Sequence, residues 1–169
     1  MPKIRCSWTK DDPLAIQYHD EEFGVPLERD DDLFERLSLE IFQAGLSWRL
    51  ILHKREALRR AFANFSIKKV AAFTEKDILR LLNDKGIIRN RLKITATIEN
   101  AKRVQKIISE YGSFAAYLKQ VNGSPEEMNR ELKRKFSFMG PKISESFLQS
   151  IGKTPPWHEP NCWRYRGES

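Results

Sequence analysis

The two cysteines of this 169-residue chain lie near its opposite ends, and each is accompanied by a histidine. Cys6 and His19 fall within the first twenty residues, whereas His158 and Cys162 fall within the last twelve. Two cysteines and two histidines form a common tetrahedral ligand set for structural zinc. Such a site would join the two termini and close the domain. Two unrelated cysteines with surface histidines are the alternative that spacing alone leaves open.

The composition is typical of one soluble globular domain, with 40% apolar and 31% charged residues. No run of eighteen apolar residues exists, so we expect no membrane span. The N-terminus lacks the apolar stretch of a signal peptide, and we therefore expect a cytoplasmic protein. In that reducing compartment a disulfide between Cys6 and Cys162 is disfavoured relative to metal binding.

The net charge of +7 favours a polyanionic partner such as DNA. Acidic residues are concentrated in the first 40 residues, whereas basic residues gather at 85–93, 130–135 and 164–166. If folding brings these basic segments onto one face, they would fit a phosphate backbone. A set of solvated helix faces is the alternative interpretation.

Apolar residues recur at spacings of three and four along most of the chain, which predicts an all-α fold. Asp30 to Asp32 are placed to cap and charge the first long helix. The segment 1–26 is not assigned, because Pro13 and Gly24 interrupt it. We expect one domain over 1–169, in which 1–26 and 153–169 form a zinc-bound lobe on a helical body. Helices are expected over 30–44, 48–62, 89–111 and 142–151, and others are expected to start after Ser66, Thr74 and Ser124.

The sequence Phe136-Ser-Phe-Met-Gly-Pro-Lys142 leads into the last predicted helix. A glycine-containing turn of this kind, as in a helix-hairpin-helix, can aim backbone N–H groups and a helix N-terminus at a DNA phosphate. Gly140 and Lys142 are therefore candidate DNA-backbone residues. A tight connection between packed helices is the commoner origin of such a pattern and stays as the alternative.

Glu40 lies within the most apolar stretch of the chain, residues 37–46. Because a buried carboxylate without a partner is costly, Glu40 either points to solvent or belongs to a functional site. Trp8, Tyr18 and Trp48 lie next to the candidate metal ligands or at a predicted helix start. There they can either line a pocket or pack in the core.

Taken together, these motifs resemble type I 3-methyladenine DNA glycosylases, in chain order from Cys6 to Cys162. The resemblance implies a helix-hairpin-helix fold with one structural zinc, held by Cys6, His19, His158 and Cys162. It also implies a monomeric, monofunctional enzyme that excises 3-methyladenine from alkylated double-stranded DNA in base excision repair. The segments that carry the resemblance include Cys6-Ser-Trp8, Tyr18-His-Asp20, Glu22-Phe-Gly-Val-Pro26, Leu39-Glu40, Gln43-Ala-Gly-Leu-Ser-Trp48, Gly86-Ile-Ile-Arg89 and Phe136-Ser-Phe138.

The same resemblance places the base pocket at Tyr18, Glu40 and Trp48, with Trp8 nearby. Glu40, the candidate catalytic residue, would supply negative charge and a hydrogen-bond acceptor to a cationic flipped base. Trp48 would offer its π face, and Tyr18 a directional hydroxyl. The competing hypothesis is a DNA-binding module, stabilised by a zinc ion, that binds damaged DNA without cleaving it. Glu40 discriminates between the two, since such a module needs no carboxylate beside a tryptophan.

The chain departs from the family pattern at Ala15, Phe23 and Ile41, where relatives usually carry an aromatic residue, tryptophan and glycine. Ile41 directly follows Glu40, and its side chain is expected to narrow the space beside the backbone there. Ala15, which is smaller than an aromatic residue, is expected to leave more space on the opposite side of the pocket. No aspartate occurs in residues 141–169, which agrees with the reduced need of this family for a general base. Lys142 stands where bifunctional members of the wider superfamily carry a Schiff-base lysine, so a lyase role is an alternative to phosphate binding.

Overall fold

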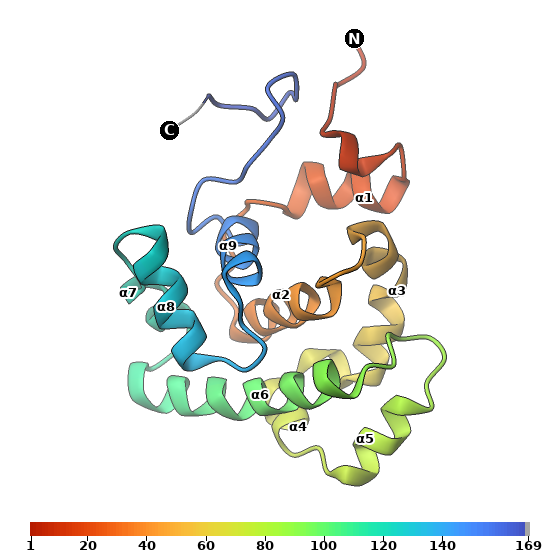
Figure 1. Ribbon diagram of the computed structural model, residues 1–169, viewed down its shortest axis with the longest axis vertical. Coiled ribbons are helices and arrows are strands. Elements are labelled where there is room, and N and C mark those ends of the chain that lie inside the picture. The colour runs from red at the N-terminus through yellow and green to blue at the C-terminus, as the bar shows by residue number, and fades with distance from the viewer. Residues whose placement is uncertain (168–169) are drawn as a thin grey trace.

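A computed structural model describes residues 1–167 of the protein, and within that range every regular element is helical (Figure 1). This confirms the all-α prediction. The elements are a 3-10 turn Ser7–Thr9, α1 (Pro13–Gln17), a π-helical turn Tyr18–Glu22, α2 (Asp30–Gln43), α3 (Trp48–Ala61), a 3-10 turn Ala63–Phe65, α4 (Ile67–Ala71), α5 (Glu75–Leu82), α6 (Arg91–Tyr111), α7 (Phe114–Gln120), α8 (Pro125–Lys135) and α9 (Pro141–Ser150).

Most helix starts follow from local capping signals. The Ser47 hydroxyl accepts the N–H of Leu50 at 3.2 Å, and Ser124 forms a capping box with Glu127. The structure adds helices that periodicity missed, namely α1, the π-helical turn and α7. Each is only five to seven residues long, which is too short to show a hydrophobic repeat.

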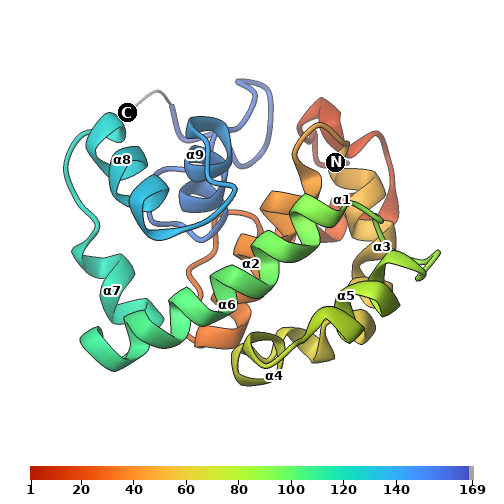
Figure 2. The same ribbon diagram turned by 60° about the horizontal axis from the view of Figure 1, so that its bottom comes forward.

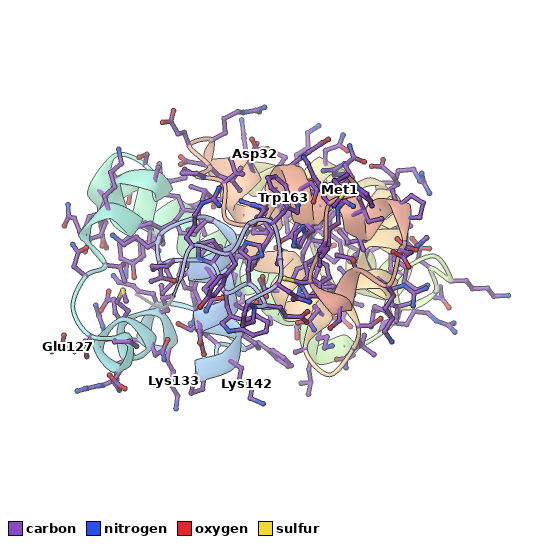
Figure 3. All side chains as sticks on the ribbon, turned by 90° about the horizontal axis from the view of Figure 1, so that it is seen from above. Met1, Asp32, Glu127, Lys133, Lys142 and Trp163 are labelled. Carbon is purple, nitrogen blue, oxygen red and sulfur yellow. The ribbon has the colours of Figure 1, made fainter. Side chains whose placement is uncertain are left out.

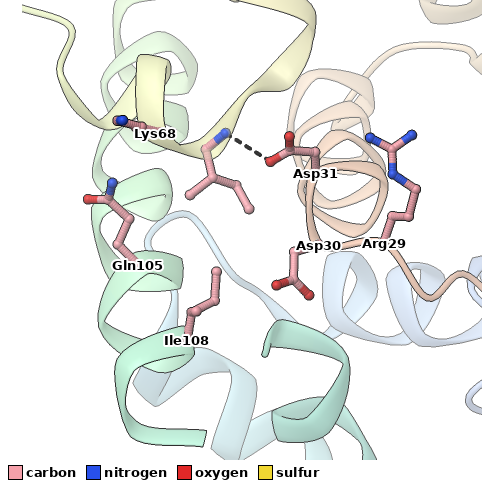
Figure 4. A pocket seen from close by; sticks show the side chains of 7 residues that line it. Arg29, Asp30, Asp31, Lys68, Gln105 and Ile108 are labelled. Atoms are coloured by element: carbon pink, nitrogen blue, oxygen red, sulfur yellow. Dashed lines mark hydrogen bonds between the residues drawn. The ribbon is translucent and has the colours of Figure 1, made fainter. Parts of the chain in front are cut away.

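The acidic run at the start of α2 caps other helices rather than its own. The N-cap residue of α2 is Arg29, and no side chain caps this end. Asp30 instead accepts the N–H of Phe114 at the start of α7 (3.0 Å), and Asp31 accepts that of Ile67 at the start of α4 (3.1 Å). Figure 4 shows these carboxylates at the wall of an open pocket between α2, α4 and α6. The predicted cap is therefore wrong for Asp30 and Asp31, which join three helices.

Helix α2 lies at the centre of the molecule and is buried from Leu33 to Phe42. It contacts α3, α6, α7 and α9, so its polar residues have little access to solvent. Helix α6 crosses beneath α2 and runs toward α7, as Figures 1 and 2 show from two directions. The turn 136–140, which joins α8 to α9, lies above the same helix.

The two ends of the chain lie side by side. The Trp163 N–H donates to the carbonyl of Ile4 at 2.9 Å, and Figure 3 shows Met1 close to Trp163. Where the tail leaves α9, Gly152 has φ +74°, and a Cβ there would lie 2.8 Å from the carbonyl oxygen of Gly24. The close approach of these two backbones therefore requires glycine at 152. Residues 168 and 169 of the expected lobe lie outside the described residues.

Within residues 1–167, no helix has the length and apolar character that crossing a bilayer demands.

Candidate functional site

The four predicted metal ligands meet at one point between the two terminal segments. The sulfurs of Cys6 and Cys162, Nε2 of His19 and Nδ1 of His158 all lie within 4.8 Å of one another, and all four side chains are buried. Cys6 Sγ is 3.4 Å from His158 Nδ1, and Cys162 Sγ is 3.4 Å from His19 Nε2. Ligands at zinc bond lengths on a tetrahedron are about 3.3–3.8 Å apart, so the donor set fits zinc.

Neighbouring groups orient the cluster. The carboxylate of Asp20 lies 2.8 Å from Nδ1 of His19, which leaves Nε2 to face the sulfurs. The guanidinium of Arg5 holds that carboxylate at 2.7 Å and keeps its pKa well below the usual range. Backbone N–H groups point at both sulfurs, from Glu159 to Cys6 (3.3 Å) and from Arg164 to Cys162 (3.4 Å). Such N–H donors favour thiolates, which are the form that binds a metal.

Burial favours the neutral form of two of the donors, Cys6 and His158, in the absence of a cation. It raises the pKa of the Cys6 thiol to about 11 and lowers the pKa of the His158 imidazole to about 4. Neutral imidazole is the form that ligates a metal, and a bound dication would favour the thiolate of Cys6. The two cysteines are not joined by a disulfide.

An aromatic cluster adjoins these ligands. Tyr18 stacks on Trp48, with ring centroids 5.2 Å apart and planes within 17° of each other. Trp8 packs edge-on against Tyr18, at 6.3 Å. Phe23, where relatives usually carry tryptophan, has its ring centroid 6.2 Å from that of Tyr18 and 5.5 Å from that of His158. The structure therefore brings the three predicted aromatic residues together.

The π-helical turn Tyr18–Glu22 explains how one short segment contributes both to the aromatic cluster and to the four candidate metal ligands. The Phe23 N–H donates to the carbonyl of Tyr18 at 2.8 Å, five residues back, which widens the turn. Tyr18 faces Trp48, while His19, the next residue, faces the sulfur of Cys162. The hydroxyl of Tyr18 is buried and finds no hydrogen-bond partner among the described residues.

Glu40 is buried with no partner. Its side chain is 1% exposed, and neither carboxylate oxygen accepts a hydrogen bond from the described part of the chain. Burial raises the pKa of Glu40 to about 8, against weaker opposing effects of the nearby Ser146 hydroxyl and Arg36 guanidinium. The hydroxyl of Ser146 does not reach hydrogen-bonding geometry with the carboxylate. Glu40 therefore does not point to solvent, and its charge is close enough to raise the pKa of Tyr18 further.

Arg36 was missed by the sequence reasoning. Its guanidinium carbon lies 5.1 Å from the ring centroid of Tyr18, and Nη1 donates to the carbonyl of Ser150 at 2.8 Å. Its position four residues before Glu40 puts both side chains on one side of α2. Arg36 also pairs with Glu22, which Arg55 contacts at 2.8 Å. These charges form a partly buried ion-pair network that touches the aromatic cluster through Arg36.

Two of the departures from the family pattern lie in different parts of the core. Ile41 is fully buried in the main apolar core, against which Trp48 of the aromatic cluster also packs. Ala15 is fully buried beside Tyr18 and Leu52, so it does belong to the region around the pocket. The expected effect of Ile41 on the backbone beside Glu40 stays a prediction.

The turn 136–140 presents Gly140 and Lys142 at the start of α9. Gly140 is the N-cap residue, with an ordinary φ of −94°, and a Cβ there would meet no atom within 4 Å. Nothing in the part of the chain that the structure describes therefore requires glycine at this position. Lys142 is exposed, and Figure 3 shows it projecting to the same side as Lys133 of α8. One member of the predicted basic segments, Lys93, is instead buried, with 6% exposure.

Comparisons with known proteins agree with this arrangement. Residues 8–132 match the family described as methyladenine glycosylase. The chain is 38% identical to DNA-3-methyladenine glycosylase 1 of Escherichia coli (strain K12), over 96% of this chain and 97% of that protein. It is 36% identical to the DNA-3-methyladenine glycosylase of Haemophilus influenzae, over 88% and 91% respectively. A structure on 3-methyladenine recognition by 3-methyladenine DNA glycosylase I of Staphylococcus aureus has a TM-score of 0.85 at 33% identity, covering 98% of each chain.

We predict that Glu40→Gln removes a pH dependence of stability. Because the pKa of Glu40 rises from 4.5 on unfolded chains to about 8 in the folded protein, its neutral form favours folding. That contribution is complete below pH 4.5 and is lost as the pH rises to 8, at up to about 1.4 kcal/mol of unfolding free energy per pH unit. The measurement is the free energy of unfolding of both proteins by denaturant between pH 5 and 8. As the pH rises, the wild-type protein should lose stability relative to Glu40→Gln. Parallel curves would contradict a buried, unpaired Glu40.

Proposed function

The chain belongs to the methyladenine glycosylase family, and on this premise we propose how its residues release 3-methyladenine from alkylated DNA. The protein is a monofunctional DNA-3-methyladenine glycosylase that acts in DNA repair. The observation that supports our assignment of the pocket is Glu40, a buried carboxylate without a partner. A module that only binds damaged DNA would gain nothing from that cost in stability.

We assign recognition of the flipped base to Glu40, Tyr18 and Trp48. Methylation at N3 makes the adenine cationic while it is attached to the sugar. A cation beside Glu40 lowers the pKa of this carboxyl again, so that the ionised form accepts a hydrogen bond from the base. Trp48 offers a π face to the cation, and the Tyr18 hydroxyl is free to donate or accept. Trp8, which packs edge-on against Tyr18, would help to exclude water from the bound base.

The reaction breaks the bond between the base and C1′ of the deoxyribose, and the oxygen of a water molecule forms the new bond to C1′ while that water releases one proton to the solvent. The bonding electrons leave with the base, which departs neutral because it was cationic before. The leaving group therefore needs no proton from the enzyme. Positive charge develops on the sugar in the transition state, and the ionised Glu40 can stabilise it. Glu40 thus combines recognition with a catalytic role, without a general base of the kind other glycosylases carry.

We propose that the cluster of Cys6, His19, His158 and Cys162 holds one structural zinc ion. The four ligands complete a closed tetrahedral site, with no position left for substrate. The ion would tie residues 1–26 to 153–169 and so complete the lobe that carries Tyr18. Since the pocket and the cluster come from one chain, we propose that a monomer is sufficient.

We propose that the turn 136–140 with Gly140 and Lys142 forms the hairpin that binds the backbone of double-stranded DNA. The N–H groups at the start of α9 and the ammonium of Lys142 would bind phosphate oxygens without reading sequence. The absence of any protein atom near Gly140 is consistent with this, because a glycine there allows close approach of a phosphate.

The base pocket is tested by two substitutions. Glu40→Gln keeps the size and removes the charge, so it should slow release of 3-methyladenine while leaving affinity for undamaged DNA unchanged. Trp48→Ala should lose stacking worth about 1–3 kcal/mol. Single-turnover release of the methylated base, read by chromatography, is the measurement. Unchanged release by Glu40→Gln would show that the carboxylate is structural.

Phosphate binding is tested at Gly140 and Lys142. Lys142→Ala should weaken duplex binding about equally across sequences and make the salt dependence shallower by about one unit. Gly140→Ala should fold with unchanged stability yet bind duplex DNA less tightly. Lys119→Ala, at an exposed site on α7, is the control. If Lys142→Ala binds DNA normally but no longer cleaves abasic DNA, the result would support the lyase role of Lys142 and contradict its role in phosphate binding.

The metal site is tested by composition and stability. Elemental analysis should find one zinc per chain in freshly purified protein, and Cys162→Ala should lose it. Loss of the closure should cost about 3 kcal/mol or more, which lowers Tm by roughly 6–12 °C. His53→Ala removes the remaining histidine and should leave the zinc content unchanged. Native protein without stoichiometric zinc would refute the assignment.

A further inference from the structure

Lys93 of α6 is a buried lysine that neutralises no acid. Its ammonium donates to the backbone carbonyls of Phe42 (2.8 Å) and Ala44 (2.7 Å), at the C-terminal end of α2. Within residues 1–167, no carboxylate lies within ion-pair distance of this ammonium, and burial lowers its pKa. Carbonyls at a helix end lack partners within the helix and attract a cation. Burying a lysine ammonium to satisfy these two carbonyls is costly. The cost indicates that the position of the C-terminal end of α2 has to be fixed.

The end of α2 that Lys93 holds is the part of the chain that places the base pocket. Glu40 lies within the last turn of α2, and Trp48 begins α3 after a short connection. The side chain of Gln43 donates to the carbonyl of Leu46 at 2.7 Å and braces the same connection. The direction in which the chain leaves α2 therefore sets the position of Trp48 relative to Glu40.

Asn100 makes a comparable contact two turns further along α6. It is 1% exposed, its Nδ2 donates to the carbonyl of Ser137 at 3.1 Å, and its Oδ1 accepts the N–H of Ser137 at 2.7 Å. Ser137 lies in the turn 136–140, in which Phe138 has φ +60°. One side chain therefore satisfies both polar groups of a turn residue whose neighbour is in a strained conformation.

Both contacts come from one side of one helix. Seven residues advance an α-helix by about 10 Å and return the side chain to nearly the same face. We propose that Lys93 and Asn100 are positioning residues that hold the base pocket and the DNA-binding turn at a fixed spacing along α6. This inference rests on the proposed function of the two regions. A flipped nucleotide must reach the pocket while its strand stays bound at the turn, so the spacing affects excision directly.

Three measurements separate this role from a general contribution to stability. They are affinity for free 3-methyladenine, affinity for undamaged duplex DNA, and the single-turnover rate of excision at saturating substrate. Lys93→Met should weaken base binding and slow excision about tenfold or more, with duplex affinity unchanged. Asn100→Leu should weaken duplex binding with base affinity unchanged. It should also slow excision at saturating DNA, because the spacing is no longer fixed.

Lys102→Met, an exposed lysine on the same helix, is the matched control and should match the wild-type protein in all three measurements. If a variant does not fold, Lys93→Gln and Asn100→Asp each keep part of the hydrogen bonding and should show the same pattern more weakly. Equal losses in both affinities for both variants, or no loss in either, would overturn the positioning role. A wild-type protein that releases no 3-methyladenine would instead overturn the proposed function.

Discussion

The contact of two histidines with two cysteine sulfurs joins the ends of the chain, and the geometry of the pocket depends on it. Tyr18 directly precedes His19, and Phe23 packs against both Tyr18 and His158. One wall of the pocket is therefore carried by the terminal segments, whereas Glu40 and Trp48 belong to the helical body. Separation of the termini would remove Tyr18 from Trp48 even if every helix of the body stayed intact.

The charges beneath the pocket differ in how they are satisfied. Glu22 and Glu35 are both paired with arginines, and Arg55 contacts each of them. Arg36 is likewise paired and hydrogen-bonded. Glu40 lies near Arg36 on the same helix but has no hydrogen-bond partner of its own among the described residues. The fold thus tolerates one unfavourable group at the place where a cationic substrate is expected to supply the missing charge.

Sequence reasoning predicted most of the helices and the set of four candidate metal ligands but not the contacts that join the helices to one another. Capping signals such as Ser47 and Ser124 are local, and the donor set is unusual enough to be recognised from composition. The caps made by Asp30 and Asp31 join segments 84 and 36 residues apart, which no local pattern reveals. Lys93 looked like part of a basic surface, because burial of a lysine depends on carbonyls from another helix.

The orientation of α2 shows why the pocket itself was only partly predictable. This helix is buried on nearly all sides from Leu33 to Phe42, so it has no polar face that marks solvent. Without that reference, periodicity cannot assign one face to the core and another to a site. Glu40 and Ile41 are neighbours in sequence, yet Ile41 enters the main core. The role proposed for Glu40 comes from the resemblance to a family and not from periodicity.

The absence of a protein partner for Glu40 also bears on turnover. Once the glycosidic bond is broken, the base in the pocket is neutral and no longer offsets the ionised carboxylate. A carboxylate buried in this way is then favoured to take up a proton, since burial alone raises its pKa to about 8. The ion pair that retains the substrate thus disappears with the reaction itself. Under the proposed role of Glu40, product release needs no separate conformational signal, because the proton that this carboxyl loses when damaged DNA binds returns when the free base departs.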